Sequence, residues 1–324
     1  MLARLGQSGS WATWREWFDL AAIVAVAAPL GGLAAFVLLR YADWGPPRDR
    51  RATGGGPELG VWQVLIAAQV IVWMLIASAG LRALAALNKE IDEVPSARAA
   101  AGDGRWRRET VAFLLFTYGV LVLFLVLAGI AGMQNPNVMA GQGWKMPVLH
   151  MVPGVATLPF FVVLKRVQLW VTEDSAWSST GKDVERVRLL RRQLRSATAS
   201  LGAIIALAVV ATGALRQAVE AASLEALPET FVIVYGAGFT GVLAGVYLYV
   251  FGALDGRARE IVANGVRVPD PDPAAADQFS ARIGLRRALA EELELGGDAK
   301  TNLEGLLVVL SPLVAAMLTR IGGL

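Results

Sequence analysis

The chain has 324 residues, of which 55% are hydrophobic and 18% are charged, with a formal net charge of +3 and a mean hydropathy of +0.51. It contains no cysteine and only one histidine, which excludes disulfides, thiolate chemistry and a metal site built from several histidines of one chain. The Walker A, His-Glu-x-x-His and Gly-x-Ser-x-Gly signatures are also missing. We therefore expect no enzyme of these classes, no bound metal and no cofactor.

Six long apolar stretches, almost free of charge, run through the sequence. A hydrocarbon core of about 30 Å is crossed by about 20 apolar residues in a helix, and only helices or closed barrels satisfy their backbone polar groups in lipid. Because the stretches are unbroken rather than alternating, they predict an all-α, polytopic integral membrane protein with six transmembrane helices and a cytoplasmic helical tail. The predicted spans are Leu20–Leu39, Val61–Gly80, Val111–Gly132, Pro147–Leu164, Ala199–Leu215 and Phe231–Leu254.

Basic residues alternate between the loops. The segments 81–110 and 165–198 carry six and eight Lys and Arg residues, whereas Met133–Met146 and Arg216–Thr230 carry one each. The positive-inside rule therefore predicts that the two basic loops and both termini lie in the cytoplasm. The bias of the composition to Ala, Arg, Gly and Val is associated with a bacterial source, so we expect a bacterial inner membrane. Tyr41–Gly60 disagrees, since it is predicted to lie outside yet holds three arginines. This leaves open that the first stretch is not a full crossing.

Tryptophans fall near the predicted span edges. Trp62, Trp106 and Trp170 lie where an amphipathic ring is expected to anchor a helix at the membrane interface. Residues 1–18 carry three further tryptophans at a spacing of three, which predicts a short helix lying in the interface.

The transmembrane domain, residues 19–254, is followed by a tail at 255–324. Three prolines stiffen a linker at 269–273, and two helices are predicted beyond it. The last apolar run, Leu306–Leu318, has 13 residues, which is short for a span but too apolar to stay in water. We expect it to join an oligomeric cytoplasmic bundle or to lie near a pore, and a seventh span is the alternative. The leucines expected to promote oligomerisation are Leu306, Leu307, Leu310, Leu313 and Leu318.

The fourth span is unusual because it contains proline. Pro153 and Pro159 each remove a helical donor, with Gly154 beside them and His150 near the predicted outer end. Freed carbonyls at membrane depth are tolerated only against protein or a water-filled cavity. One hypothesis is a bent element in which these four residues line a pathway. The other is a kinked span packed inside the protein.

The sixth span is rich in glycine. Gly236, Gly238 and Gly241 spell the letters of a dinucleotide fingerprint, but the motif lies inside an apolar helix and lacks the strand that such a site needs. Together with Gly245 these glycines instead predict close helix packing in lipid, either within the subunit or between subunits.

A basic amphipathic helix is predicted from Asp183 to Arg195, leading into the fifth span. Its arginines are expected to contact anionic lipid headgroups, and a phosphate-bearing ligand is the alternative. No aromatic residues are interleaved for base stacking, so we expect no sequence-specific binding to nucleic acid. The arginines are Arg186, Arg188, Arg191, Arg192 and Arg195.

These features together favour a homo-oligomeric channel or pore in the lipid bilayer. We expect it to conduct ions and to be gated from the cytoplasmic side, where a soluble regulator is a further possible partner. Glu220, Glu225 and Glu229 share one outer loop and would form a charged ring at its mouth, which favours a cation. A stress or phage-defence effector is the biological setting suggested by analogy. The first alternative is a non-conducting membrane sensor or scaffold whose tail binds a soluble partner. The second is an intramembrane enzyme that modifies lipid.

Overall fold

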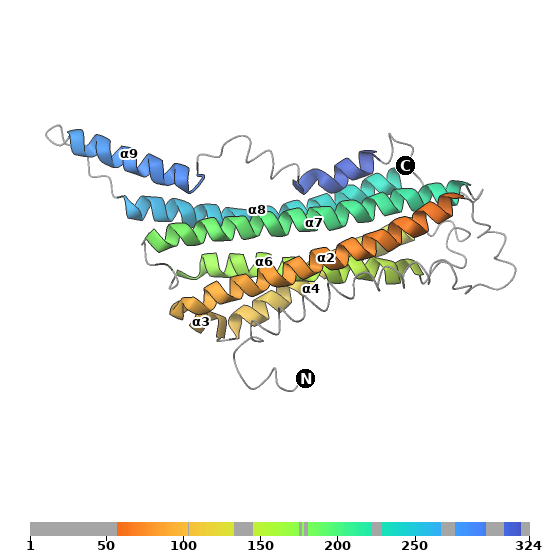
Figure 1. Ribbon diagram of the computed structural model, residues 1–324, viewed down its shortest axis with the longest axis horizontal. Coiled ribbons are helices and arrows are strands. Elements are labelled where there is room, and N and C mark those ends of the chain that lie inside the picture. Colours follow the sequence, from red (N-terminus) through yellow and green to blue (C-terminus); the bar gives the residue numbers. More distant parts are fainter. Residues whose placement is uncertain are drawn as a thin grey trace.

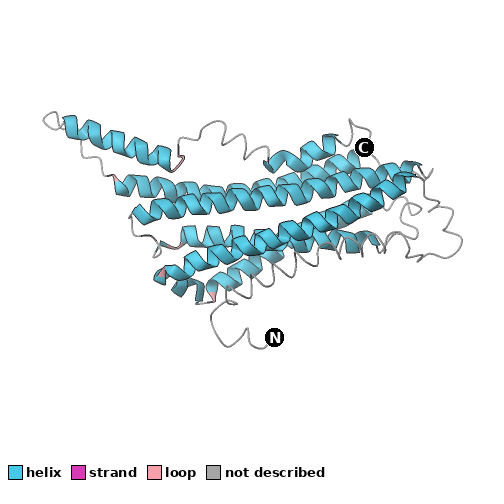
Figure 2. Ribbon diagram, viewed as in Figure 1, coloured by secondary structure: helices cyan, strands magenta, loops and turns pink. Residues whose placement is uncertain are grey.

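The computed structural model describes residues 57–102, 104–132, 145–174, 177, 181–221, 229–266, 276–295 and 308–318. Within these ranges the chain is all-helical and contains no strand (Figure 2). The interfacial segment 1–18, the first predicted span and the proline linker at 269–273 lie outside the described residues.

Long helices lie side by side along the long axis of the molecule, and shorter ones flank them (Figure 1). The helix α3 is at one end of this bundle, and α9 continues past the same end. The long helices are α2 (Pro57–Glu93), α4 (Arg105–Gly132), α6 (Lys145–Thr172), α7 (Gly181–Ala221) and α8 (Glu229–Gly265). The short ones are α3 (Pro95–Gly102), α9 (Ala276–Glu292) and a C-terminal helix, Val308–Leu318.

Four helices are long and apolar enough to cross a membrane, in α2, α6, α7 and α8. They contain most or all of the second, fourth, fifth and sixth predicted spans. The third predicted span, Val111–Gly132, is helical within α4, which is not among those four. The described part of the chain therefore has the composition of a helical membrane protein with four candidate spans.

The core is organised around α6, which contacts α2, α4, α7 and α8. In the apolar window of α6, 78% of the residues are buried in the protein, compared with 22% in α8. Its side chains Phe160, Phe161 and Leu164 are almost fully buried. A helix enclosed in this way meets other helices rather than lipid on most of its circumference.

The helices extend well beyond the predicted spans at one end of the bundle. The 41 residues of α7 measure about 60 Å at 1.5 Å per residue, twice the thickness of a hydrocarbon core. The basic segments 81–110 and 165–198 both lie at this end, where α2, α3 and α4 meet the end of α6 and the start of α7 (Figure 1). We call it the polar end of the bundle.

The turn between α2 and α4 follows from its sequence. Val94 precedes Pro95, and a residue before proline is disfavoured in a helix, so α2 ends at Glu93 and α3 begins at the proline. Gly104 then takes a φ of 81°, which only glycine adopts without strain, and its carbonyl accepts a hydrogen bond from Arg108 N–H in the first turn of α4.

The C-terminal helix packs against α7 and α8 of its own chain through two glycines. A Cβ atom at Gly202 of α7 would lie 2.8 Å from Ser311 Oγ and 2.9 Å from the Val308 carbonyl oxygen. A Cβ atom at Gly236 of α8 would lie 2.8 Å from the Ala316 Cβ. Only glycine permits backbones to approach this closely, so both positions are needed for docking.

Candidate functional site

The polar end of the bundle contains a group of arginines and carboxylates that joins α7 and α8 to the end of α9. We call this group the tail clamp, and it consists of Arg188, Arg191, Arg195, Asp255, Glu292 and Glu294. Its arginines come from the basic helix predicted at 183–195, which the structure shows to be continuous with the fifth predicted span in α7.

Arg191 is the buried member of the tail clamp. Its side chain is only 7% exposed, and it pairs with Asp255 of α8 and with Glu294 beyond α9, each at 3.4 Å. Its Nε atom is also buried and has no hydrogen-bond partner in the part of the chain that the structure describes. A buried charge that loses its partner is costly, because the desolvation that the partner offsets remains. Arg191 therefore needs both carboxylates.

The outer arginines of the tail clamp are more exposed. Arg195 pairs with Glu294, and Arg188 pairs with Glu292 in the last turn of α9. Pairs that are about half exposed, as these are, contribute little individually in water. Together with Arg191 they fix the position of the end of α9 relative to α7.

The backbone at the end of α9 is shaped to present Glu294. The Leu295 N–H donates to the Ala290 carbonyl at 2.8 Å, and the Glu294 N–H donates to the Glu291 carbonyl at 2.9 Å. This is a Schellman ending, in which the left-handed residue is usually glycine. Here Glu294 has a φ of 52°, although a side chain in that region costs about 1 kcal/mol. The strained position brings its carboxylate to Arg191 and Arg195.

Apolar contacts support the tail clamp. Leu293 is fully buried in the main core, and Leu289 lies 3.6 Å from the position of a Cβ atom at Gly265. By contrast, the side chains of residues 280–288 are exposed, including Ile283 and Leu285. Among the described side chains of this segment, those that pack against the core lie at the C-terminal end of α9.

The other arginines of the predicted basic helix behave differently. Arg186 donates to Asp183 at 2.7 Å, and the Asp183 side chain is fully buried. Arg192 is exposed to solvent. The predicted contact of these arginines with anionic lipid or with a phosphate ligand stays a prediction, and three of the five are engaged by carboxylates of α8 and the tail.

A second set of charges lies where α4 meets α6. Lys165 donates to Gln168 at 2.7 Å and to Glu109 at 3.3 Å, and Arg105 binds the same carboxylate at 3.0 Å. Burial raises the pKa of the Glu109 carboxyl, but the hydrogen bonds and charges of Arg105 and Lys165 outweigh this effect, so the net pKa is below its ordinary value. Glu109 is therefore an anion that neutralises two cations.

Two arginines at this end pack on tryptophan rings. The Arg166 guanidinium lies 5.7 Å from the centre of the Trp106 ring, and that of Arg257 lies 5.6 Å from the centre of the Trp177 ring. Arg257 also donates to the Val171 carbonyl at 3.0 Å, which ties α8 to the end of α6. Sequence reasoning did not single out Arg257 or the clamp carboxylates, because their partners are more than 60 residues away along the chain.

The proline-containing helix α6 is packed inside the protein. Pro153 and Pro159 are buried, and the Gly154 carbonyl accepts hydrogen bonds at 2.7 Å from Tyr118 of α4 and from Thr157. The Tyr118 hydroxyl also lies 2.9 Å from Thr157 Oγ1. These contacts join α4 to α6 next to Pro153, but the carbonyls that the two prolines leave without a helical donor are those of Leu149 and Val155. The pathway and the packed interpretations of this span both stay predictions. The side chain of His150 lies outside the described residues.

The glycines of α8 divide into two groups. Gly236 is buried against the C-terminal helix and Gly238 is half-buried, whereas Gly241 and Gly245 are exposed, with no atom within 4 Å of an added Cβ. One part of the predicted packing face is thus used within the chain and the other is open.

The remaining predicted residues are placed only in part. Leu310 and Leu313 are half-buried and Leu318 is 60% exposed on the C-terminal helix, while Leu306 and Leu307 lie outside the described residues. The side chains of the outer-loop carboxylates Glu220, Glu225 and Glu229 lie outside them as well. The proposed charged ring therefore remains a prediction.

Comparison with family models, with curated proteins and with solved structures gives no significant match. The fold defines the class, which is that of an all-helical protein with four candidate membrane-spanning helices in its described part. Among the described residues no group of three or more His, Cys, Asp and Glu side chains could hold a metal ion.

Proposed function

We propose that the chain forms a homo-oligomeric membrane channel that conducts ions and is gated from the cytoplasmic side through the tail clamp. The observation that carries this proposal is an open face on α8. Exposed residues recur along this helix at spacings of three and four, so they form one continuous stripe. They are Val234, Ala237, Gly241, Gly245, Leu248, Gly252 and Gly256.

The composition of this α8 stripe fits a second copy of the chain. In lipid, helix association is driven by close packing, which small residues permit, rather than by the hydrophobic effect. The stripe contains four glycines at which an added Cβ would have no neighbour within 4 Å among the described residues. Since the interior of one chain is packed around α6, the conducting path in this proposal lies between copies.

The tail clamp is suited to act as the gate control. It engages α7 at the end that the basic residues predict to be cytoplasmic, and the same helix continues without a break into its candidate span. A signal that releases α9 would remove partners from the buried Arg191 and change the forces on α7. Ion flow in this proposal follows the release.

Liposomes loaded with potassium test the proposal. We expect wild-type protein to be an oligomer in detergent, and we expect Glu294→Gln to increase the potassium flux by weakening the clamp. The double variant Gly241→Leu with Gly245→Leu should be a monomer without flux. Gly119→Leu is the matched control, because Gly119 is also open on an exposed helix face, of α4, and should leave both properties unchanged. A monomeric wild type, or no flux from wild type and from Glu294→Gln, contradicts the proposal.

A non-conducting scaffold is the second candidate, and the exposed half of α9 favours it. Ile283 is 45% and Leu285 is 62% exposed on a helix that only its last turns attach to the bundle. Apolar side chains displayed in this way are suited to bind a soluble partner. Retrieval of one defined partner by the full chain, lost in Ile283→Ser with Leu285→Ser and accompanied by no flux, would favour the scaffold.

A further inference from the structure

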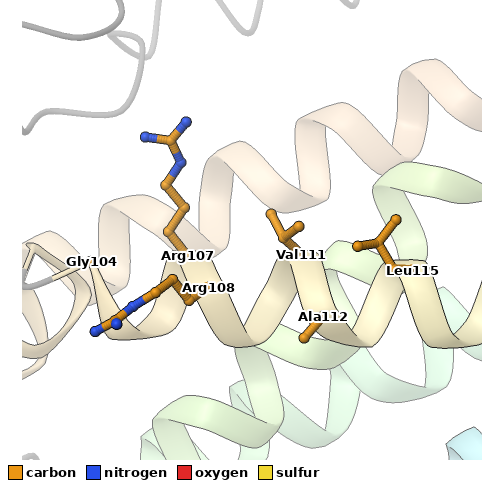
Figure 3. Close-up of a pocket in the computed structure, with 6 residues that line it drawn as sticks. All are labelled: Gly104, Arg107, Arg108, Val111, Ala112 and Leu115. Carbon is orange, nitrogen blue, oxygen red and sulfur yellow. The ribbon is translucent and has the colours of Figure 1, made fainter.

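An open pocket of about 540 Å³ lies along the first three turns of α4 and combines positive charge with apolar surface (Figure 3). It lies at the polar end of the bundle, on a part of α4 to which no function has been given above. The pocket is lined by Gly104, Arg107, Arg108, Val111, Ala112 and Leu115.

No ion pair within the described ranges compensates the charge of the pocket. Arg107 and Arg108 are exposed, and neither forms an ion pair within the described ranges, unlike the arginines of the tail clamp. The nearby carboxylate of Glu109 is already held by Arg105 and Lys165. The N-terminal end of α4 adds the partial positive charge of its free N–H groups. Figure 3 shows the Arg107 side chain on the side of α4 that carries Val111 and Leu115, whereas the Arg108 side chain points away from it. An anion placed here meets the Arg107 guanidinium directly, and the exposed Arg108 side chain joins it only by turning toward the same side. The Glu109 carboxylate does not compete for either arginine.

The apolar part of the pocket continues from its charged part along the same side of the helix. Arg107, Val111 and Leu115 are spaced by four residues, and Figure 3 shows their side chains projecting from one side of α4. Val111 is 49% and Leu115 is 71% exposed. Eight residues of helix rise about 12 Å, which is the scale on which a bilayer passes from headgroup phosphate to acyl chain.

We propose that this pocket binds one anionic glycerophospholipid. The Arg107 guanidinium donates to its phosphate oxygens, the exposed Arg108 side chain turns toward the same phosphate, and one acyl chain lies over Val111 and Leu115. Arginine is matched to phosphate because its planar fork donates two parallel hydrogen bonds. A zwitterionic lipid binds more weakly, because its own cation competes for the phosphate. The proposal goes beyond the channel function and depends only on the placement of these helices in a membrane.

Native mass spectrometry of the full chain in detergent tests this site. Phosphatidylglycerol and phosphatidylcholine with identical acyl chains are titrated separately, and the dissociation constant of the first bound lipid is measured. We expect wild type to prefer phosphatidylglycerol, and we expect Arg107→Gln with Arg108→Gln to weaken that binding at least tenfold. Arg82→Gln with Lys89→Gln is the matched control. It also removes two exposed cations near the polar end, from α2, and should change the constant less than twofold.

The same titrations separate specific lipid binding from two alternatives, which are binding of a soluble phosphate ligand and general attraction of anions to positive charge. Equal weakening in both double variants would mean general attraction to charge and would overturn the proposal, as would the absence of any preference in wild type. Glycerol 3-phosphate binding as tightly as phosphatidylglycerol would identify a soluble phosphate ligand instead and would also overturn it. Leu115→Asn should weaken binding of long-chain but not of short-chain phosphatidylglycerol. Unchanged thermal unfolding of the Arg107→Gln, Arg108→Gln variant would show that the loss is local.

Discussion

Arg191 and Glu294 lie 3.4 Å apart, although 103 residues separate them along the chain. This contact joins a buried guanidinium of a candidate span-forming helix to the residue that ends the tail helix. The same carboxylate also binds Arg195, so a single side chain connects the tail to two turns of α7. The end of α9 is therefore fixed in register with α7, and its release is a local event with one defined centre.

Replacing Glu294 by glutamine should loosen α9 without unfolding the bundle. The variant keeps the size of the side chain but removes the charge that faces Arg191 and Arg195. With pairs that are partly exposed, we expect a loss of about 1 kcal/mol in docking free energy. Amide hydrogen exchange within residues 276–295 should then be about fivefold faster.

Glu291→Gln is the control for this experiment. Among the described residues, Glu291 forms an ion pair with Arg287 alone, on the exposed surface of the same helix at 3.2 Å, so the exchange pattern of Glu291→Gln should match wild type. Equal acceleration in both variants, or none in Glu294→Gln, would show that the ion pairs do not hold α9 in place.

Replacing Gly236 by alanine should displace the C-terminal helix. The new Cβ would be 2.8 Å from the Ala316 Cβ and from the Pro312 carbonyl oxygen, and the second of these is backbone that cannot rotate away. Overpacking of this kind costs about 1–3 kcal/mol. The midpoint of thermal unfolding in detergent should fall. Gly119→Ala, at an open helical position, should leave the midpoint unchanged or raise it slightly.

Much of this fold follows from the apolar pattern of the sequence, because the length and continuity of the stretches predict helices long enough to cross a bilayer. Val61–Gly80 and Ala199–Leu215 are helical, and the basic segment before the second of these continues into it as expected. The pattern does not reveal how far the helices extend beyond the span. That extension depends on tertiary contacts. One example is the hydrogen bond that Arg257 donates to the Val171 carbonyl, 86 residues earlier in the chain.

The tryptophans show a second property that the sequence does not predict, which is the direction that a side chain faces. Trp62, Trp106 and Trp170 were predicted as interfacial anchors, but each is at most 2% exposed and is buried in protein. Hydropathy locates a residue along the membrane normal without saying whether it faces lipid or another helix. The orientation is decided by neighbours such as Arg166, which packs on the Trp106 ring.

The sequence predicted only the basic half of the tail clamp. The arginines of α7 were visible as a basic cluster with helical spacing, and this suggested an anionic partner. The carboxylates that bind them, Glu292 and Glu294, lie beyond a proline linker, and no local pattern relates the two segments. Their pairing is a tertiary contact, which a sequence reveals only through compared relatives.

Replacing Tyr118 by phenylalanine should destabilise the contact between α4 and α6. The ring would keep its edge-on contact with Phe161, whose centre is 5.8 Å away, but the hydrogen bonds to the Gly154 carbonyl and to Thr157 would be lost. A net loss of about 1 kcal/mol is expected, measured as a lower unfolding midpoint. Tyr249→Phe, at a ring that is 55% exposed, is the matched control and should have no effect. A midpoint as high as wild type in Tyr118→Phe would show that α6 does not rely on this bond.

The ion pairs of Glu109 should make stability depend on pH in the acid range. Its folded pKa is lowered, so the unfolded chain binds the proton more tightly, and the stabilisation is fully present above the ordinary pKa of 4.5. It is lost as the pH falls through the folded pKa, which lies below that value. The difference in unfolding midpoint between wild type and Glu109→Gln should therefore be constant above about pH 5.5, one unit above the ordinary pKa, and should shrink in stronger acid.

Glu93→Gln is the control for this pH dependence. It removes an exposed carboxylate from α2 that forms no ion pair within the described ranges, so its unfolding midpoint should stay close to that of wild type at every pH. A Glu109→Gln difference that does not shrink in acid would mean that Arg105 and Lys165 stabilise this junction without help from the Glu109 charge.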